Sequence, residues 1–233
     1  TYSMFTYKTF NNIAEDGLAV MASKNISGVS ENPDALILRS HKLLATEFGN
    51  NLSAIARAGA GVNNIPIQDA TDIGVVVFNT PGANANAVKE LVICGMLLSS
   101  RGIVDGINFA KNLDSSDTDV LNKMLEAQKK TFAGNELAGK TIGIVGLGAI
   151  GSMLAQASQA LGMKLVGFDP HISIDSAWRL PREVKKAETL EDLLKQSDYV
   201  SLHVPLVEAT KNLINASNLK YFKSDARLIN LSR

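Results

Sequence analysis

Short apolar runs alternate along the chain with longer segments in which apolar residues recur at helical spacing. In the first half, the runs predict strands at residues 4–10, 35–39, 54–58 and 74–78, followed by a helix from about residue 86 to residue 100. The run at residues 35–38 is apolar throughout, which is typical of a strand buried on both faces of a sheet. This alternation predicts an α/β fold in which helices cover parallel sheets.

The second half repeats the alternation with a second set of strands. An apolar strand begins near Lys140, and further strands are predicted at residues 164–168, 184–187, 198–204 and 226–231. Helix-forming residues fill positions 152–161. Thr189 opens another helix with a start that resembles a capping box, in which Asp192 takes the place of the usual glutamate. Two successive sets of strands predict two domains.

The segment Asn79-Thr80-Pro81-Gly82 is the best candidate for the domain boundary, because proline removes a backbone donor and glycine relaxes φ. We therefore expect one domain at residues 1–82 and another at residues 83–233. Residues 102–136 are more polar and predict a helical arm, with a helix around residues 120–130 that lies outside the main core. Two interpretations of the arm stay open: a solvated surface helix, or a helix that packs on a second subunit.

Composition narrows the class of protein. The 233 residues carry 23 Lys+Arg and 23 Asp+Glu, and this zero net charge argues against nucleic acid as a main partner, because phosphates need a basic surface. The apolar runs fall well short of the roughly 20 residues that span a bilayer, and the N-terminal residues lack the pattern of a signal peptide. The single cysteine indicates a reducing compartment. We expect a cytoplasmic protein with neither a membrane nor a nucleic-acid partner.

Two further expectations concern residues that often carry chemistry. Cys94 lies on the apolar helix at residues 86–100, and we expect it to be a buried small hydrophobic residue rather than a nucleophile. No cluster of His, Cys, Asp and Glu has the spacing of metal ligands, so no metal is predicted.

The strongest chemical signal is a glycine-rich motif directly after a predicted strand. Residues 146–151 read Gly-Leu-Gly-Ala-Ile-Gly, which fits the G-x-G-x-x-G pattern that binds the pyrophosphate of a dinucleotide. Gly146 allows the tight turn, Gly148 lets the backbone approach the pyrophosphate, and Gly151 lets the next helix pack close to the strand. Exposed amides and the positive end of that helix then hold the phosphates.

Asp169 supplies the second part of this signal. It ends the strand at residues 164–168 and follows Gly151 by 18 positions, close to the roughly 20 that place a carboxylate on the ribose hydroxyls. A carboxylate there also repels a 2′-phosphate, so NAD is the predicted cofactor rather than NADP. Because Pro170 follows, a simple turn role for Asp169 stays open as the alternative.

Several blocks of sequence resemble the D-isomer-specific 2-hydroxyacid dehydrogenases, and within that family the branch that oxidises D-3-phosphoglycerate. The resemblance runs from about Ala35 to Arg233. The blocks are LILRS at residues 36–40, RAGAGVNNI at 57–65, NTPG at 79–82, GKTIGIVGLGAIG at 139–151, GMKLVGFDP at 162–170, SDYVSLHVPL at 197–206 and LINLSR at 228–233. Several blocks in the right order are far more specific than any one alone.

The resemblance implies a Rossmann-type NAD-binding domain, incomplete at its C-terminus, and a flavodoxin-like substrate domain. It implies hydride transfer between C2 of a small 2-hydroxy acid and NAD, in a cleft between the two domains. The implied reaction is the oxidation of 3-phosphoglycerate to 3-phosphohydroxypyruvate, which opens L-serine synthesis, so the expected substrate carries a phosphate. The resemblance also implies a homodimer or homotetramer.

Roles for individual residues follow from the same resemblance. Arg233 matches the catalytic arginine that clamps the α-carboxylate and polarises the C2 oxygen, a task that suits a planar bidentate donor. Arg39 and Ser40 match a strand end that holds the substrate phosphate or carboxylate. The substrate carboxylate is cradled by the amides of Gly59, Ala60, Gly61 and Val62. Besides Gly146, Gly148, Gly151 and Asp169, the implied cofactor contacts are Ala149, Ile150, Val204, Pro205, Leu231 and Ser232.

The sequence also departs from the family pattern. Ala149 replaces an often basic residue, and Asn63 replaces a common aspartate. The family's acid/base histidine and the glutamate that orients it lie beyond the turn that holds Arg233. We therefore expect the 233-residue chain alone to bind NAD better than it catalyses. Its own histidines, His41, His171 and His203, are not placed to act as that base, and His41 stays open between loop packing and substrate contact.

Two other functions stay open. Another D-2-hydroxyacid dehydrogenase, such as a glyoxylate or hydroxypyruvate reductase, has the same architecture, and Arg39 with Lys42 is modest evidence for a substrate with two anionic ends. A non-catalytic regulator that binds NAD is the alternative from a different class, because a fold does not determine a function.

Overall fold

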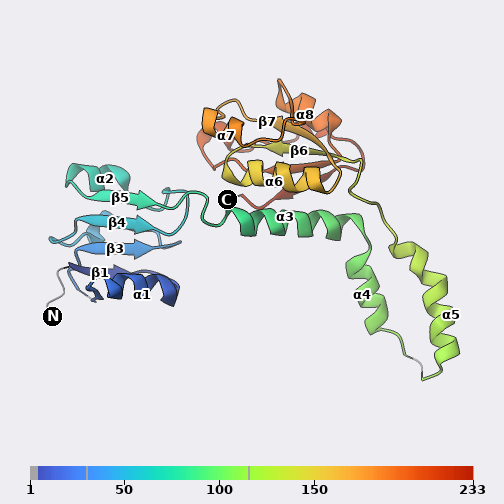
Figure 1. Ribbon diagram of the computed structural model, residues 1–233, viewed down its shortest axis with the longest axis horizontal. Helices are drawn as coiled ribbons and strands as arrows, with labels where there is room; N and C mark the ends of the chain where they lie inside the picture. The colour runs from blue at the N-terminus through green and yellow to red at the C-terminus, as the bar shows by residue number, and fades with distance from the viewer. Residues whose placement is uncertain (1–4, 30, 115, 233) are drawn as a thin grey trace. The chain divides into compact units, whose positions relative to one another are not determined.

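The computed structural model describes residues 5–29, 31–114 and 116–232, and the chain divides into two compact units (Figure 1). The first unit is Thr1–Asn84 and the second is Ala85–Arg233. Met4, at the start of the first predicted strand, and Arg233 lie outside the described residues. Each unit has its own parallel sheet.

The sheet of the first unit contains five parallel strands in the order β2-β1-β3-β4-β5. This is the order of flavodoxin-like folds, so the predicted class of this unit is confirmed. Its elements are β1 (Phe5–Thr9), α1 (Glu15–Ser23), β2 (Ile26–Gly28), β3 (Ala35–Leu38), η1 (Ala45–Glu47), β4 (Ala54–Arg57), α2 (Ile67–Asp72) and β5 (Val76–Asn79).

One face of this sheet forms the core of the first unit. Leu36, Ile55 and Val77 are neighbours across β3, β4 and β5, and Leu36 and Ile55 are almost completely buried. Side chains alternate along a strand, so the next residues face the other way. On that opposite face, Val76 and Phe78 of β5 remain 47% and 56% exposed. The core therefore lies between one face of the sheet, α2 and the connecting loops.

The sheet of the second unit has the order β10-β9-β6-β7-β8, and all its pairs are parallel. Counted from β6, this is the order of the first five strands of a Rossmann sheet, as predicted. Its elements are α3 (Ala85–Ser100), α4 (Ile103–Lys111), α5 (Thr118–Gln128), η2 (Lys129–Phe132), β6 (Thr141–Val145), α6 (Ala149–Ala160), β7 (Lys164–Phe168), α7 (Ile174–Trp178), β8 (Lys185–Lys186), α8 (Leu190–Gln196), β9 (Tyr199–Leu202), η3 (Glu208–Thr210), η4 (Leu219–Tyr221) and β10 (Arg227–Asn230).

Helices cover both faces of the second sheet (Figure 1). On one face, Val92 of α3 and Leu154 of α6 share a buried cluster with Ile144 of β6. On the other face, Leu193 of α8 shares a second cluster with Val200 of β9. Because the central strands β6, β7 and β9 are buried on both sides, their sequences are nearly continuous apolar runs, and this is why the pattern located them.

Two details of α3 and α6 differ from the expectations. Cys94 is exposed, so its predicted burial was wrong. Val92 and Met96 are the buried residues around it, and residues two apart on a helix do not share a face. α6 begins at Ala149 rather than at residue 152, because Gly148 serves as its N-cap and the helix starts inside the glycine motif.

α4 and α5 form an arm that extends from the second unit (Figure 1). No described residue of either helix is buried. At the base of the arm, Phe132 packs against Phe109 with ring centroids 5.5 Å apart, and its carbonyl accepts a hydrogen bond from the Gly102 amide at 3.1 Å. The helices of the described chain include none that is both long and apolar enough to cross a bilayer.

Candidate functional site

The glycine-rich turn joins β6 to α6 at the carboxyl edge of the second sheet. Gly146 has a φ of +90°, which L side chains rarely adopt, and its amide donates to the Phe168 carbonyl at 2.9 Å. A Cβ on Gly151 would lie 2.1 Å from the Gly146 carbonyl oxygen, so a glycine is needed for α6 to start this close to the strand. A Cβ on Gly148 would meet nothing within 4 Å, and the backbone is open to a ligand at that point.

α6 starts from this turn without a capping side chain. Gly148 is the N-cap residue, and the helix is 12 residues long. Among the described residues, none accepts a hydrogen bond from the amides of Gly148, Ala149 or Ile150. Unpaired amides at the positive end of a helix bind phosphate groups. These residues therefore fit the pyrophosphate of a dinucleotide.

Asp169 lies beside the turn, directly after β7. Its Oδ2 accepts a hydrogen bond from the Leu147 amide at 2.8 Å, and its Oδ1 accepts one from the His171 amide at 2.9 Å. The bond to His171 is the local turn contact that the sequence left open. Each carboxylate oxygen has a second lone pair, so Asp169 remains able to accept hydrogen bonds from ribose hydroxyls as well.

The ends of β9 and β10 reach the same edge of the sheet. A Cβ on Gly146 would lie 3.0 Å from Cγ1 of Val204, so the end of β9 contacts the glycine turn. Ser232, after β10, donates through its hydroxyl to the Leu202 carbonyl at 2.8 Å. Pro205 and Leu231 follow these strands and are exposed. All the described residues predicted to contact the cofactor therefore belong to one edge of the second unit.

His203 lies at this edge as a neutral side chain. Its Nε2 is 2.8 Å from the Ser201 hydroxyl oxygen. Burial lowers the pKa of His203 from 6.5 to about 4, because removing the imidazolium from water is unfavourable. His203 is therefore a weak base at neutral pH and contributes no positive charge to the edge.

In the first unit, the loop after β3 is held by side chains from other strand ends. Asn11, which follows β1 with a φ of +67°, accepts hydrogen bonds through Oδ1 from the amides of Ser40 at 2.9 Å and His41 at 2.8 Å. Arg57 Nε donates to the Arg39 carbonyl at 2.9 Å. The backbone of the loop is thus fixed, while the Arg39 side chain is exposed.

The loop at residues 59–62, after β4, is fastened to the end of β5. Thr80 Oγ1 accepts a hydrogen bond from the Gly59 amide at 2.7 Å, and Asn79 Nδ2 donates to the Ala60 carbonyl at 2.7 Å. Within the part of the chain that the structure describes, the other three amides of this loop donate no hydrogen bond. Successive free amides form a concave site for an anion such as a carboxylate.

His41 is half-buried between an aromatic ring and a carboxylate. Its ring stacks on Phe10 with centroids 4.2 Å apart and an interplanar angle of 6°. Its Nε2 lies 3.1 Å and 3.2 Å from the two carboxylate oxygens of Glu47. Burial alone raises the pKa of Glu47, but hydrogen bonds from the Leu44 amide and His41 outweigh it and hold that pKa below its usual value. The charged carboxylate therefore orients the ring beside the Arg39 loop.

Comparison with known proteins identifies the family. The sequence profile of the D-isomer specific 2-hydroxyacid dehydrogenase, NAD binding domain, matches residues 105–233, more than half of the chain. The chain belongs to this family. Its matched part is the family's NAD-binding domain, so NAD is the cofactor, in agreement with the prediction from the glycine motif.

Curated relatives of the chain carry two different enzyme names, hydroxypyruvate reductase and D-3-phosphoglycerate dehydrogenase. The hydroxypyruvate reductase of Thermotoga maritima is 37% identical over 86% of this chain and 60% of its own length. The D-3-phosphoglycerate dehydrogenase of Synechocystis sp. is 37% identical over 86% of this chain and 34% of its own length. The D-3-phosphoglycerate dehydrogenase of Rattus norvegicus is 34% identical over 95% of this chain and 40% of its own length. The chain therefore spans between about a third and three fifths of the length of these relatives.

Solved structures of similar proteins have the same fold. The TT0316 protein from Thermus thermophilus is 24% identical with a TM-score of 0.80, and the match covers 98% of this chain and 74% of that one. The NAD+-bound 3-phosphoglycerate dehydrogenase of Entamoeba histolytica is also 24% identical, with a TM-score of 0.71 and coverage of 98% and 72%. These matches confirm the α/β architecture of a D-2-hydroxyacid dehydrogenase.

Sequence reasoning missed the residues that hold the candidate substrate loops. Asn11 and Glu47 are two of them, and Asn64, whose Nδ2 donates to the His41 carbonyl at 2.7 Å, is a third. An asparagine directly after a strand is a signal for a positive φ, so Asn11 could have been found. Glu47 ends the short helix η1, Asn64 lies in a loop, and neither carries such a signal. Arg233 lies outside the described residues, and its role stays a prediction.

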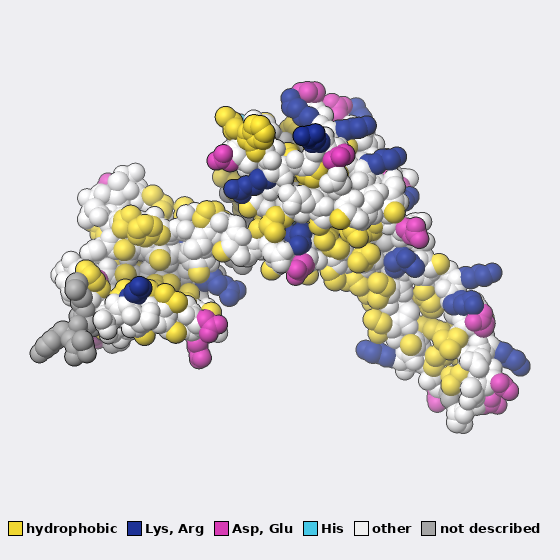
Figure 2. Space-filling view, viewed as in Figure 1, with side chains coloured by type: hydrophobic (Ala, Val, Ile, Leu, Met, Phe, Trp, Pro, Cys, Tyr) yellow, Lys and Arg dark blue, Asp and Glu magenta, His cyan; other side chains and the backbone are white. Residues whose placement is uncertain are grey.

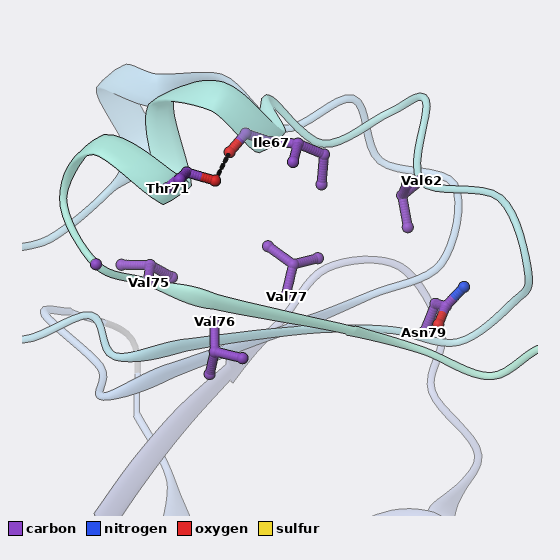
Figure 3. A pocket seen from close by; sticks show the side chains of 8 residues that line it. Val62, Ile67, Thr71, Val75, Val76, Val77 and Asn79 are labelled. Atoms are coloured by element: carbon purple, nitrogen blue, oxygen red, sulfur yellow. Dashed lines mark hydrogen bonds between the residues drawn. The ribbon is translucent and has the colours of Figure 1, made fainter.

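A pocket of about 550 Å³ lies next to the loop at residues 59–62, between α2 and β5 (Figure 3). Val62, Ile67, Val75 and Val77 line it, with Asn79 at one end. The described residues that line this pocket include no charged side chain. Because the Val62 side chain lines this pocket, Val62 presents only its amide on the concave side of the loop at residues 59–62.

Proposed function

We propose that the protein oxidises D-3-phosphoglycerate to 3-phosphohydroxypyruvate with NAD, the reaction that opens L-serine synthesis. Relatives named D-3-phosphoglycerate dehydrogenase support this substrate. The observation that carries the proposal is the pair of anion-binding features on the neighbouring strands β3 and β4. These are the exposed Arg39 guanidinium and the free amides of the loop at residues 59–62. Two such features suit a substrate with a carboxylate and a phosphate.

In this proposal each group of the chain has a distinct task. The amides after β4 hold the α-carboxylate, and Arg39 holds the phosphate with two parallel N–H donors. Arg233 contacts the carboxylate and polarises the C2 oxygen, as its match to the family motif implies. The free amides of α6 hold the pyrophosphate, and Asp169 holds the adenosine ribose. When bound, NAD supplies the nicotinamide ring that accepts the hydride from C2.

The test is to replace Arg39 in the full-length protein that carries this chain. Arg39→Gln is expected to lower kcat/KM for 3-phosphoglycerate by about 10- to 100-fold, because a hydrogen bond between charged groups is lost. For glycerate, which lacks the phosphate, the loss is expected to stay below about threefold. Lys24→Gln is the matched control, since it removes an exposed cation of the same unit at the end of α1 and is expected to leave both kcat/KM values unchanged. Equal losses for both substrates would show that Arg39 does not recognise the phosphate.

Reduction of hydroxypyruvate is the second candidate function. The relative from Thermotoga maritima, which is 37% identical, favours it. The two candidates differ in whether the phosphate improves the substrate. NADH-dependent reduction of hydroxypyruvate and of 3-phosphohydroxypyruvate therefore needs to be compared at equal concentrations. A higher kcat/KM for the unphosphorylated substrate would favour the second candidate.

We also propose that the arm packs on a second copy of the chain, in a homodimer or in a homotetramer built from such dimers. Apolar side chains of both arm helices are exposed, and Figure 2 shows hydrophobic surface along α4 and α5 and over α3. Val104 and Ile107 of α4 are 53% and 49% exposed, and Leu125 of α5 is 43% exposed. Exposed apolar patches mark interaction surfaces, and symmetric assembly with a second copy is the commonest way to cover them.

A further inference from the structure

The glycine-rich turn has a front part, residues 146–147, whose amides donate hydrogen bonds, and a rear part, residues 148–150, whose amides have no partner among the described residues. In the front part, the Gly146 amide donates to the Phe168 carbonyl at 2.9 Å, and the Leu147 amide donates to Asp169 Oδ2 at 2.8 Å. The rear part begins at Gly148 and carries the amides that have no partner among the described residues. The free amides are held from behind by α6, where the Ser152 amide donates to the Gly148 carbonyl at 2.9 Å, and from the front by the bonded part of the turn.

Leu147 fastens the turn to β7 by its side chain as well as by its amide. The residue is only 5% exposed, and a Cβ on Gly167 would lie 2.9 Å from its Cδ1, so the Leu147 side chain packs directly on β7. Water therefore has little access to replace Asp169 as the acceptor for the Leu147 amide. A hydrogen bond to an ionised carboxylate is also stronger than one to a neutral acceptor. The end of β7 thus holds the turn through both the side chain and the backbone of Leu147.

We propose that Asp169 is a positioning residue for the pyrophosphate-binding turn, in addition to its contact with the ribose. Its Oδ1 accepts a hydrogen bond from the His171 amide at 2.9 Å, which fixes the orientation of the carboxylate and directs Oδ2 to Leu147. One lone pair on each oxygen is left for the two ribose hydroxyls, so both roles operate together. Asp169 therefore holds the free amides in place before the dinucleotide arrives.

This proposal separates two contributions to the affinity for dinucleotide. If Asp169 only bound the ribose, its replacement would not affect a ligand without ribose hydroxyls. If Asp169 also positions the turn, its replacement weakens the binding of that ligand as well. The suitable probe is an NADH analogue whose adenosine ribose lacks both the 2′- and the 3′-hydroxyl, compared with NADH itself.

The dissociation constants of both probes are measured by calorimetry with the 233-residue chain and its variants. Asp169→Ala is expected to weaken NADH binding by about 10- to 100-fold and binding of the analogue by about fivefold or more. Asp169→Asn keeps a single acceptor oxygen, so a smaller loss for the analogue is expected. Asp175→Ala removes an exposed carboxylate from α7 and controls for the change in charge. Binding of the analogue to Asp169→Ala with unchanged affinity would overturn the proposal.

A second measurement begins with the wild-type chain, whose result alone can contradict the proposal. In the cofactor-free wild-type chain, the Leu147 amide is expected to exchange with deuterium at least about tenfold more slowly than the Gly148 and Ala149 amides, measured residue by residue by NMR. In Asp169→Ala that difference is expected to disappear. A Leu147 amide that exchanges as fast as the Gly148 amide in the wild type would show that Asp169 does not hold the turn.

Discussion

At the scale of single residues, burial decides the charge of His203. In the folded protein the pKa of His203 is lowered from 6.5 to about 4. In the unfolded chain, the same imidazole takes up a proton near its ordinary pKa. Between about pH 6.5 and pH 4 the unfolded state therefore binds more protons, and the folded state loses stability as the pH falls. A pKa shift of this size corresponds to about 3 kcal/mol over the whole interval.

Replacement of His203 is therefore expected to flatten the dependence of stability on pH. Between pH 7 and pH 4.5, the unfolding free energy of the wild type, measured with urea, is expected to fall by about 2–3 kcal/mol more than that of His203→Asn. The lowered carboxylate pKa values of Asp34 and Asp198 act below this window, because their contributions are lost only as the pH falls through those values. His171→Asn, at an exposed site, is expected to keep the wild-type slope. An equally steep slope in His203→Asn would assign the effect to another group.

The sequence indicated candidate binding residues at the two carboxyl edges, but it did not indicate the residues that hold their loops. Gly146, Gly148 and Gly151 follow from a motif whose spacing has a mechanical reason. The contact from Asn11 to Ser40 joins positions 29 apart, and that from Asp169 to Leu147 joins positions 22 apart. Such pairs meet only because strand order brings their loops to one edge, and the spacing of apolar residues carries no information about them.

At the scale of elements, α8 shows how a local signal fixes the start of a helix. Thr189 was predicted to open it, and its Oγ1 accepts a hydrogen bond from the Asp192 amide at 3.1 Å. Thr189→Ala is expected to lower the unfolding free energy of the chain by about 1 kcal/mol, because a capping bond is lost at a helix that covers the second sheet. Thr118→Ala is the control, since Asp117 caps α5 there. Equal losses in urea unfolding would contradict a capping role for Thr189.

The elements that the pattern missed are those that bury little. α1 contains no buried residue, and β2 has three residues, so neither needs a pronounced apolar stripe. No separate helix was predicted for α4, because Gly106 lies inside it and glycine disfavours helices. α4 nevertheless forms, and none of its residues is buried. β7 is buried along most of its length and was located at its observed bounds. Buried strands such as β7 are thus the elements whose bounds the apolar pattern locates best.

At the scale of the whole molecule, both sheets have a run of free backbone amides at their carboxyl edges. The first unit presents free amides at residues 60–62, and the second presents them at residues 148–150. Backbone amides attract anions without adding formal charge. A chain with 23 basic and 23 acidic residues can therefore hold small anions, such as the substrate proposed above and the dinucleotide, through its backbone. Zero net charge argues against a nucleic-acid surface, but it is compatible with two small anion sites.

The arm gives the last prediction, which concerns the assembly of the protein. If its apolar surface packs on a second copy, the 233-residue chain has at least twice the monomer mass by light scattering after size-exclusion chromatography. A negative charge on each arm helix, as in the double variant Ile107→Glu with Leu125→Glu, is expected to shift the protein to the monomer mass, because a buried unpaired charge is strongly unfavourable. Ile174→Glu changes an apolar residue of α7 that is 78% exposed, and it is expected to leave the mass unchanged. Two results would contradict this prediction: a wild-type chain that elutes as a monomer, or an arm variant that keeps the larger mass with unchanged circular dichroism. Either would mean that the arm is a solvated surface element, the other interpretation that the sequence left open.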